Sequence, residues 1–167
     1  MKNIILIGIM GTGKTTISKL LADQLNRPMI DMDDYIVEKF NQTIPEMFDI
    51  SEDYFRDCET ECCIDMAKID GMVISTGGGV VKKKENIAYL KENGFIIYID
   101  RPLDAIMSDV ETASRPLLKN GPEALYDLYD QRHPLYLQAC DLRIVNDKPL
   151  MDMVDQIIQQ LKNKHVI

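Results

Sequence analysis

The glycine-rich segment Gly8–Thr15 is the feature that most restricts how this chain can fold. It reads GIMGTGKT and fits the pattern G-x-x-x-x-G-K-[ST], a loop that follows a strand, opens a helix and encloses phosphate oxygens with its backbone N–H groups. The flanking sequence agrees, because Lys2–Gly8 is a compact apolar run and Lys14–Leu25 repeats apolar residues at helical spacing. The N-terminus of that helix would add partial positive charge to the loop. The segment therefore predicts a strand–loop–helix unit that binds a nucleoside triphosphate.

Two side chains of this loop complete the predicted nucleotide site. The ammonium of Lys14 would lie between the β- and γ-phosphates, and the hydroxyl of Thr15 would bind Mg²⁺. Guanine-specific proteins usually carry an N-K-x-D segment, which this sequence lacks, so ATP is favoured over GTP. We expect one Mg²⁺ per subunit and an ATP site that includes Gly11, Thr12, Gly13, Lys14, Thr15 and Thr16.

Length and charge narrow the class of protein. The chain of 167 residues is long enough for one domain with a substantial core and too short for two ordinary ones. A net charge of −8 argues against general attraction to nucleic acid or to an anionic membrane, and the apolar stretch Ile4–Gly8 is too short for a signal peptide or a membrane span. We expect a cytoplasmic monomer whose partners are small molecules.

The sequence contains no C-x-x-C pair, so we favour reduced structural thiols over a zinc site for its cysteines, which are Cys58, Cys62, Cys63 and Cys140.

Short apolar runs alternate with longer helical patterns along the chain. This alternation predicts a parallel sheet covered by helices on both faces, so the expected fold class is α/β, with residues 1–167 in a single domain. The segment Val110–Gly121 interrupts the periodicity with small and polar residues, a proline and a glycine, and we interpret it as a mobile functional loop. The expected strands are Lys2–Gly8, Met29–Ile30, Met72–Ile74, Phe95–Ile99 and Leu142–Val145.

The carboxylates after the second expected strand are candidates for metal binding and proton transfer. Asp31 and Asp33 lie at the C-terminal end of a strand, which is the edge of a parallel sheet where ligands bind. Because they are two residues apart on an extended chain, we expect them to point the same way. One could hold Mg²⁺ through water while the other accepts the proton of an attacking hydroxyl. For Asp34 we favour a structural role, as the cap of a helix that begins near Tyr35.

Two further patterns are ambiguous when each is taken alone. Arg56 and Glu59 lie one helical turn apart, so Glu59 could brace the guanidinium, although such pairs are usually surface ion pairs. The triplet Gly77–Gly79 follows the apolar run Met72–Ile74. Glycines at the end of a buried strand indicate either a tight turn or close approach by a ligand. Each pattern by itself favours the structural alternative.

Six motifs occur together in the sequence: the phosphate loop, D-M-D from Asp31, F-R-x-x-E from Phe55, S-T-G-G-G from Ser75, R-P-L-L from Arg115 and R-x-P-x-Y from Arg132. In this order and at these spacings they resemble the shikimate kinases, small P-loop enzymes of the nucleoside-monophosphate-kinase class. The resemblance runs from Ile4 to about Pro149 and implies a three-layer P-loop kinase fold, with a central parallel sheet of five strands, flanking helices and a mobile lid at about residues 110–121. It implies transfer of the γ-phosphate of ATP to the 3-hydroxyl of shikimate, which gives shikimate 3-phosphate and ADP in the chorismate route to aromatic amino acids.

The resemblance also implies catalytic roles for individual residues. Asp33 would contact the reacting hydroxyl, and Lys14 and Arg115 would act with it in catalysis. Arg115 would come from the lid to the transferring phosphate and would also belong to the ATP site. This leaves Asp31 to hold Mg²⁺ through water, together with the hydroxyl of Thr15.

The remaining implied roles concern the acceptor and the base. Arg56 and Arg132 would clamp the carboxylate of shikimate, and the region of about residues 33–61 would form most of its binding site. Gly77, Gly78 and Gly79 would place bare backbone N–H groups against the ring hydroxyls. The loop Asn146–Pro149 would flank adenine, with Pro149 in the ATP site.

The sequence departs from the family pattern in places, and other functions stay open. Ser51 stands where members often have glycine, Ser108 and Asp109 stand where many have a second lid arginine, and the loop near Lys148 lacks the arginines often found there. A gluconate kinase or another small-molecule P-loop kinase would share the fold, although S-T-G-G-G is not expected of gluconate kinases and a monophosphate acceptor would call for more arginines. A non-catalytic ATP-binding module would bind ATP without turnover.

Overall fold

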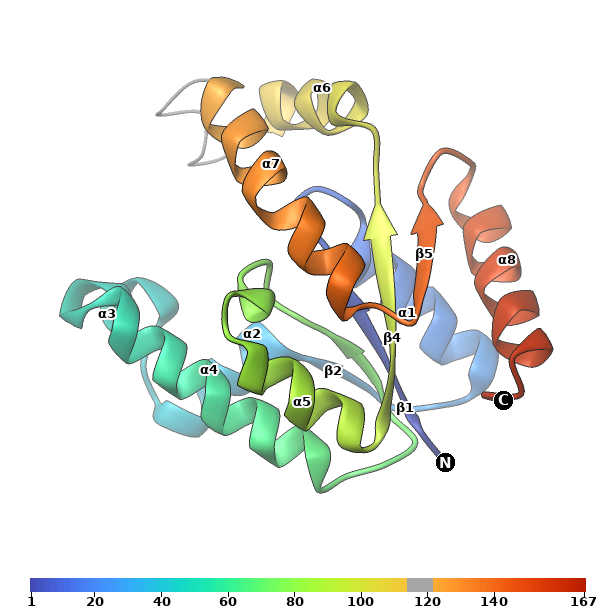
Figure 1. The fold of residues 1–167 in the computed structure, drawn as a ribbon, viewed down its shortest axis with the longest axis horizontal. Coiled ribbons are helices and arrows are strands. Elements are labelled where there is room, and N and C mark those ends of the chain that lie inside the picture. The colour runs from blue at the N-terminus through green and yellow to red at the C-terminus, as the bar shows by residue number, and fades with distance from the viewer. Residues whose placement is uncertain (114–121) are drawn as a thin grey trace.

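One parallel sheet of five strands organises the computed structural model, which describes residues 1–113 and 122–167 (Figure 1). The order across the sheet is β2-β3-β1-β4-β5, so β1 is central, and its Ile5 lies opposite Ile74 of β3 and Ile96 of β4. The loop after β1 therefore leaves the sheet at the point where the strand order reverses, which is where α/β proteins bind ligands. The strands are β1 (Asn3–Ile7), β2 (Met29–Asp31), β3 (Val73–Ser75), β4 (Gly94–Asp100) and β5 (Leu142–Val145), which confirms the five expected strands.

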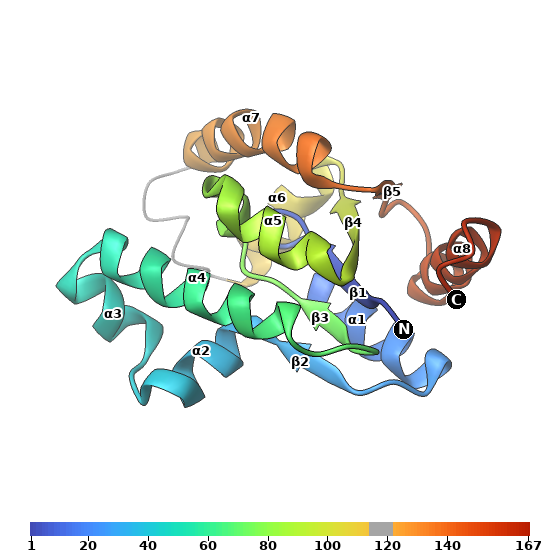
Figure 2. The same ribbon diagram turned by 60° about the horizontal axis from the view of Figure 1, so that its bottom comes forward.

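Helices cover both faces of the sheet, as Figures 1 and 2 show. Alternate residues of a strand point to opposite faces, and β1 accordingly supplies both halves of the core. Ile4 and Leu6 pack with α1 and α8, whereas Ile5 and Ile7 pack with α2, α4, α5 and α7. The helices are α1 (Lys14–Leu25), α2 (Met32–Phe40), α3 (Ile44–Ile50), α4 (Glu52–Ala67), α5 (Lys84–Glu92), α6 (Leu103–Ala113), α7 (Pro122–Ala139) and α8 (Leu150–Asn163), with a short 3₁₀ helix η1 (Val80–Lys82).

Side-chain caps set the boundaries of the helices near the ligand-binding edge. The hydroxyl of Thr43 accepts a hydrogen bond from the N–H of Glu46 at the start of α3, and that of Ser51 accepts one from the N–H of Tyr54 at the start of α4. Ser51 has an extended backbone with φ −174°, a conformation open to any residue. Ser51 therefore gives α4 a cap without backbone strain.

The cysteines of α4 belong to the core. Cys58, Cys62 and Cys63 are free thiols and are buried among apolar side chains. Burial raises the pKa of Cys62 to about 12 and raises that of Cys63 above its ordinary value, so these thiols stay protonated near neutral pH. Within residues 1–113 and 122–167, no three His, Cys, Asp or Glu side chains are grouped so that they could hold a metal ion.

The structure covers the predicted lid only in part. The lid was expected at about residues 110–121, and residues 114–121, which include Arg115, lie outside the described residues. α6 leads to this segment and α7 follows it (Figure 1).

None of the described helices combines the length and the apolar character that crossing a bilayer requires.

We expect Gly94→Ala to destabilise the fold, because β4 begins where α5 has just ended. A Cβ atom at Gly94 would lie 2.4 Å from the carbonyl oxygen of Leu90 and 2.4 Å from Cδ1 of Ile5. Overpacking of this kind costs about 1–3 kcal/mol, and urea denaturation should show a loss of free energy of unfolding in that range. Gly71→Asn is the matched control, since asparagine tolerates its φ of 72° and a Cβ there meets only Met1 Sδ at 3.5 Å. Equal losses in the two variants would contradict the steric argument.

Candidate active site

The phosphate loop is shaped by its contacts with the end of β4 and with α1. A Cβ atom at Gly8 would lie 2.5 Å from the carbonyl oxygen of Ile99, so only glycine lets the loop leave the sheet this close to β4. Gly13 caps α1 with φ 89°, in the left-handed region, and Thr12 is buried with its hydroxyl donating to the carbonyl of Ile9 at 2.9 Å. The glycines of the motif are therefore required by backbone geometry before any ligand is considered.

Lys14 is held inside this loop. Its side chain is buried, and its ammonium donates to the carbonyl oxygens of Gly8 and, at 3.1 Å, of Ile9. Burial lowers the pKa of Lys14 to about 8, against the opposing effect of the Asp33 carboxylate and with a further lowering by Arg132. An arriving phosphate would restore the favourable environment that burial removes, so the buried ammonium is suited to bind an anion.

A cavity of about 320 Å³ joins the phosphate loop to the glycine triplet after β3. Residues of the predicted ATP site form one side, while Asp33 and the triplet form the other. Donor and acceptor groups would therefore meet in one space. The lining residues are Met10, Gly11, Thr12, Gly13, Lys14, Thr15, Thr16, Asp33, Thr76, Gly77 and Gly78.

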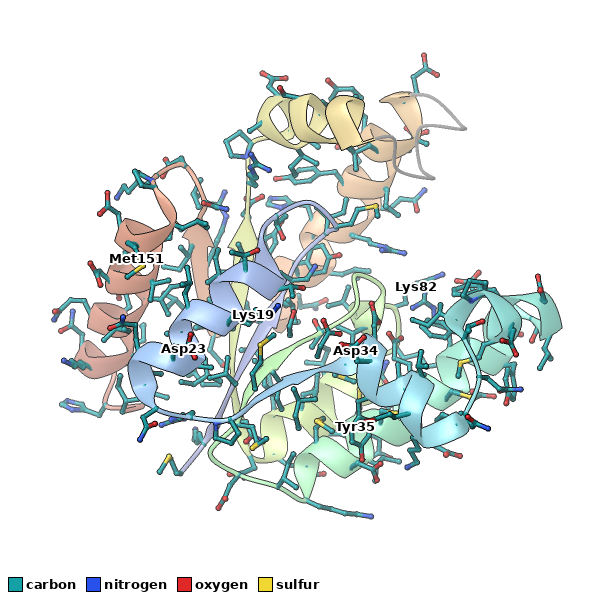
Figure 3. The ribbon with its side chains drawn as sticks, turned by 180° about the vertical axis from the view of Figure 1, so that it is seen from behind. Lys19, Asp23, Asp34, Tyr35, Lys82 and Met151 are labelled. Atoms are coloured by element: carbon teal, nitrogen blue, oxygen red, sulfur yellow. The ribbon has the colours of Figure 1, made fainter. Side chains whose placement is uncertain are left out.

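The helix after β2 begins earlier than the sequence suggested. α2 starts at Met32, and its cap is Asp31, whose Oδ1 accepts hydrogen bonds from the N–H groups of Asp33 at 2.9 Å and Asp34 at 3.4 Å. The expectation that Asp34 caps a helix beginning near Tyr35 is therefore wrong; Figure 3 marks both residues, which lie within α2. The strand ends at Asp31 because its carboxylate satisfies the first free N–H groups of the helix.

The early helix start separates the two candidate carboxylates. Asp33 lies in the first turn of α2, so the argument that Asp31 and Asp33 point the same way along an extended chain does not hold. Asp33 lines the cavity, and its Oδ1 lies 3.0 Å from the position of a Cβ atom at Gly77. Loss of solvent raises the pKa of Asp33, as does the charge of Asp31, while Lys14 opposes the shift. A carboxylate with a raised pKa is a stronger proton acceptor, so Asp33 is suited to act as a general base.

Arg56 reaches the triplet from α4. Its Nη1 donates at 3.1 Å to Oε1 of Glu59, whose side chain is only 1% exposed, so the expected brace is confirmed and is buried rather than a surface pair. Burial raises the pKa of Glu59, and the charge and hydrogen bond of Arg56 oppose that shift. On its outer side Arg56 contacts Glu52, which also pairs with Lys82 of η1. A Cβ atom at Gly79 would lie 2.3 Å from Arg56 Nη1, so glycine is needed for the guanidinium to occupy this position.

Arg132 and Tyr136 reach the same triplet from α7. A Cβ atom at Gly78 would lie 3.2 Å from Nη1 of Arg132, and the buried hydroxyl of Tyr136 donates to the carbonyl of Gly78 at 2.5 Å. The triplet is thus the point at which side chains from α2, α4 and α7 converge. The structure brings Arg56, Arg132 and Asp33, three of the residues predicted for the acceptor site, together around it.

A second cavity, of about 640 Å³, adjoins the first and shares Gly13 and Thr16 with it. It contains Pro149, which was predicted for the ATP site, and Asn146, whose Nδ2 donates to the carbonyl of Thr12 at 2.9 Å. Arg101 also lines it, and its Nη1 donates to the carbonyl of Gly11 at 2.9 Å. The sequence analysis missed Arg101, for which the only signal is its position immediately after a buried strand.

A buried polar network, also missed from the sequence, fixes α7 to the sheet. The side chain of Asp100 is only 4% exposed, and its Oδ2 accepts hydrogen bonds from Nη2 and Nε of Arg143 at 2.6 and 3.1 Å. The hydroxyl of Tyr129 donates to its Oδ1 at 3.1 Å. One turn along α7, His133 stacks on Tyr129 and its Nδ1 lies 2.8 Å from the hydroxyl of Tyr98. These contacts hold the helix that carries Arg132 against β4, and Arg143 joins β5 to the same carboxylate.

Comparison with known proteins places this geometry in a family. The family model for shikimate kinase matches residues 10–162. A shikimate kinase of Clostridium botulinum is 48% identical over 163 residues, which are 97% of this chain and 96% of that protein. A shikimate kinase of Caldicellulosiruptor bescii is 42% identical and covers 88% of this chain and 87% of its own.

Solved structures agree with this comparison. The shikimate kinase from Acinetobacter baumannii in complex with shikimate superposes with a TM-score of 0.89 and 32% identity, over 98% of this chain and 94% of that one. The shikimate kinase from Aquifex aeolicus gives a TM-score of 0.80 and 30% identity, over 98% of each chain. Fold and sequence therefore point to the same family.

The lowered pKa of Lys14 predicts that nucleotide binding takes up a proton at alkaline pH. With a pKa of about 8 in the free protein, Lys14 is partly neutral at pH 8.5, whereas bound phosphate favours the charged form. The affinity for ADP should therefore fall by up to about tenfold per pH unit above 8. Calorimetry at pH 8.5 in two buffers of different ionisation enthalpy measures the protons taken up.

Lys14→Arg is the matched control, because a guanidinium stays charged throughout this range. This variant should show little proton uptake at pH 8.5, whatever its affinity for ADP. Uptake equal to that of the unmodified protein would assign the linked proton to another group.

Proposed function

The chain belongs to the shikimate kinase family, which transfers a phosphoryl group from ATP to a hydroxyl of shikimate, and we propose that the transfer takes place in the cavity between the phosphate loop and the glycine triplet. The observation that carries this proposal is the convergence of two guanidinium groups and one carboxylate, from Arg56, Arg132 and Asp33, beside a buried phosphate-loop lysine. Paired guanidinium groups suit a planar carboxylate, and a carboxylate with a raised pKa suits a hydroxyl that must lose its proton.

The nucleotide is proposed to extend across both cavities. Its phosphates would lie against the N–H groups of the loop and the N-terminus of α1, with the ammonium of Lys14 exchanging its carbonyl partners for phosphate oxygens. The base would occupy the second cavity beside Pro149. The two cavities share Gly13 and Thr16, which supports a single ligand spanning them.

The acceptor is proposed to bind against the triplet. Arg56 and Arg132 would hold the carboxylate of shikimate, with Glu59 fixing the guanidinium of Arg56 by the buried ion pair. The bare backbone of the triplet would face the ring hydroxyls. Because Arg56 and Arg132 lie directly over Gly79 and Gly78, a carboxylate bound to them would place the ring beside these glycines.

For the reaction itself we assign the proton to Asp33. The hydroxyl oxygen of the acceptor would form a bond to the γ-phosphorus while its proton passes to the Asp33 carboxylate, and the bond from the γ-phosphorus to the β-phosphate oxygen would break to release ADP. Lys14 would neutralise the charge that develops on the phosphates. A part for Arg115 rests on the family resemblance, since this residue lies outside the described ranges.

Magnesium is proposed to bind through Thr15 and, by way of water, Asp31. Thr15 is exposed and lines the phosphate cavity, and Asp31 adjoins Asp33 and acts electrostatically on Lys14. Hydroxyl and carboxylate oxygens are ligands that Mg²⁺ accepts, and in nucleotide sites it keeps several waters and takes most other ligands from phosphates. The donor set therefore fits. When bound, the ion would neutralise charge on the β- and γ-phosphates.

We further propose that residues 1–167 act as one domain and as a monomer in the cytoplasm. The described side chains assigned to the two cavities come from this one chain, on loops and helices around the C-terminal edge of one sheet. The proposed reaction therefore needs no residue from a second subunit.

We expect release of ADP to depend on shikimate. The purified protein with ATP and Mg²⁺ should release ADP rapidly when shikimate is added. Release should stay at background rate with AMP, which has no carboxylate for the two guanidinium groups, and with gluconate, because S-T-G-G-G is not expected of gluconate kinases. A coupled assay measures the release, and Lys14→Met, which removes the phosphate-binding charge, should reduce it to background. Release with gluconate or AMP and not with shikimate would overturn the acceptor assignment. ATP binding without turnover would favour a non-catalytic module.

Gly79→Ala should impair shikimate binding more than ATP binding. The added Cβ, 2.3 Å from Arg56 Nη1, must displace the guanidinium, and loss of a charged hydrogen bond costs about 1.5–3 kcal/mol, or roughly 10- to 150-fold in affinity. Arg132→Lys should act in the same direction, since lysine cannot reproduce a bidentate fork on a carboxylate. Calorimetry with each ligand separately tests this. An equal loss for both ligands would indicate damage to the fold or an assignment of these arginines to the nucleotide.

A further inference from the structure

Arg101 occupies a place in the second cavity that none of the six motifs predicts. It follows β4 directly, and its side chain lines the cavity together with the segment Asn146–Leu150 and with Ala105 of α6. The cavity adjoins the phosphate loop, because Gly13 and Thr16 form part of its wall. The guanidinium of Arg101 therefore lies beside the space assigned to the phosphates and not within it.

A hydrogen bond to the phosphate loop helps to orient the guanidinium of Arg101. Nη1 donates to the carbonyl of Gly11 at 2.9 Å, and such a bond uses the edge of the planar group, where the N–H bonds lie. The two faces of the plane are not used by this bond. A guanidinium held by its edge can therefore present a face to a flat aromatic ligand.

The other part of the cavity wall is tied to the same loop. Nδ2 of Asn146 donates to the carbonyl of Thr12 at 2.9 Å, so Arg101 and Asn146 are bonded to consecutive residues of the phosphate loop. The position of a group in this cavity is therefore set relative to the phosphates. The lining includes the charged residues Asp147 and Lys148 as well as apolar surface from Ala105, Pro149 and Leu150, and this apolar surface suits the face of a planar ring.

We propose that Arg101 stacks on the purine ring of the bound nucleotide and supplies the part of the affinity that depends on the base. The proposal rests on the assignment of the phosphate loop to ATP. Arg101 is then a specificity-determining residue of the nucleotide site. In this proposal the hydrogen bond to Gly11 has a second role besides bracing the loop, because it orients the guanidinium for stacking.

The competing explanation is that Arg101 only braces the loop through Gly11. The two explanations differ in which ligands they affect. A brace would act on every ligand that binds the loop by its phosphates, whereas a stacking group would act only on ligands that carry a base. ADP and inorganic tripolyphosphate separate these cases.

The experiment is calorimetric titration of the whole chain with ADP and with tripolyphosphate, each with Mg²⁺. Arg101→Ala should weaken ADP binding by about 3- to 30-fold, the range for a lost stacked cation, and should leave tripolyphosphate binding within about twofold. Arg101→Lys keeps a donor for the Gly11 carbonyl and the charge but lacks the planar group, so it should also weaken ADP selectively. Arg27→Ala is the matched control, because it removes the same charge where Nη1 donates to the carbonyl of Lys2, and it should change neither affinity.

The titrations test the stacking role of Arg101 separately from the assignment of the phosphate loop. Equal weakening of both ligands in Arg101→Ala, or no weakening of ADP in either Arg101 variant, would overturn the stacking role. Failure of the unmodified protein to bind either ligand would instead overturn the assignment of the phosphate loop itself. Should Arg101→Ala fail to fold, as far-UV circular dichroism would reveal, Arg101→Lys decides the question alone.

Discussion

The rest of the site depends on the burial of one ammonium group, that of Lys14. A lysine inside a strand-to-helix turn loses its hydrating water, and hydrogen bonds to two carbonyls of its own loop replace only part of that hydration. The nearby carboxylates of Asp33 and Asp31 offset some of this cost, while Arg132 adds to it. The free protein therefore holds its cations in an environment that an anionic ligand improves. This is the physical reason why an acidic protein of net charge −8 can bind a polyanion at one place.

The glycine triplet allows charged side chains from several helices to meet at one point. Asp33 comes from α2, Arg56 from α4 and Arg132 from α7, and each lies close to where one of the three glycines would carry a Cβ atom. The triplet lies where β3 ends, next to the central strand. Glycine is required there by the protein's own side chains, which adds to the requirement that a ligand would impose.

The C-terminal end of β4 joins the two halves of the site through two consecutive residues. Asp100 is directed toward α7, where it accepts a hydrogen bond from Tyr129, and its carbonyl accepts one from the N–H of Asn146 at 2.6 Å. Arg101 is directed toward the phosphate loop. The helix that carries Arg132 and the cavity assigned to the base are thus both positioned from one strand end.

The amino-acid sequence was sufficient to predict the α/β architecture, the five strands, the phosphate loop and the side chains that meet around the triplet. These depend on local patterns: apolar periodicity, a loop motif between a strand and a helix, and motif spacing along a known family. The features that local patterns could not settle are of two kinds, one local and one that depends on contacts between segments far apart in the chain. Asp31 caps α2 because a three-residue strand ends there, a local competition that alternating patterns could not resolve. Arg101 and the Asp100 network lie outside every motif, and their partners are 29 to 90 residues away. Such pairs are fixed by packing of the sheet edge, so periodicity carries no signal for them.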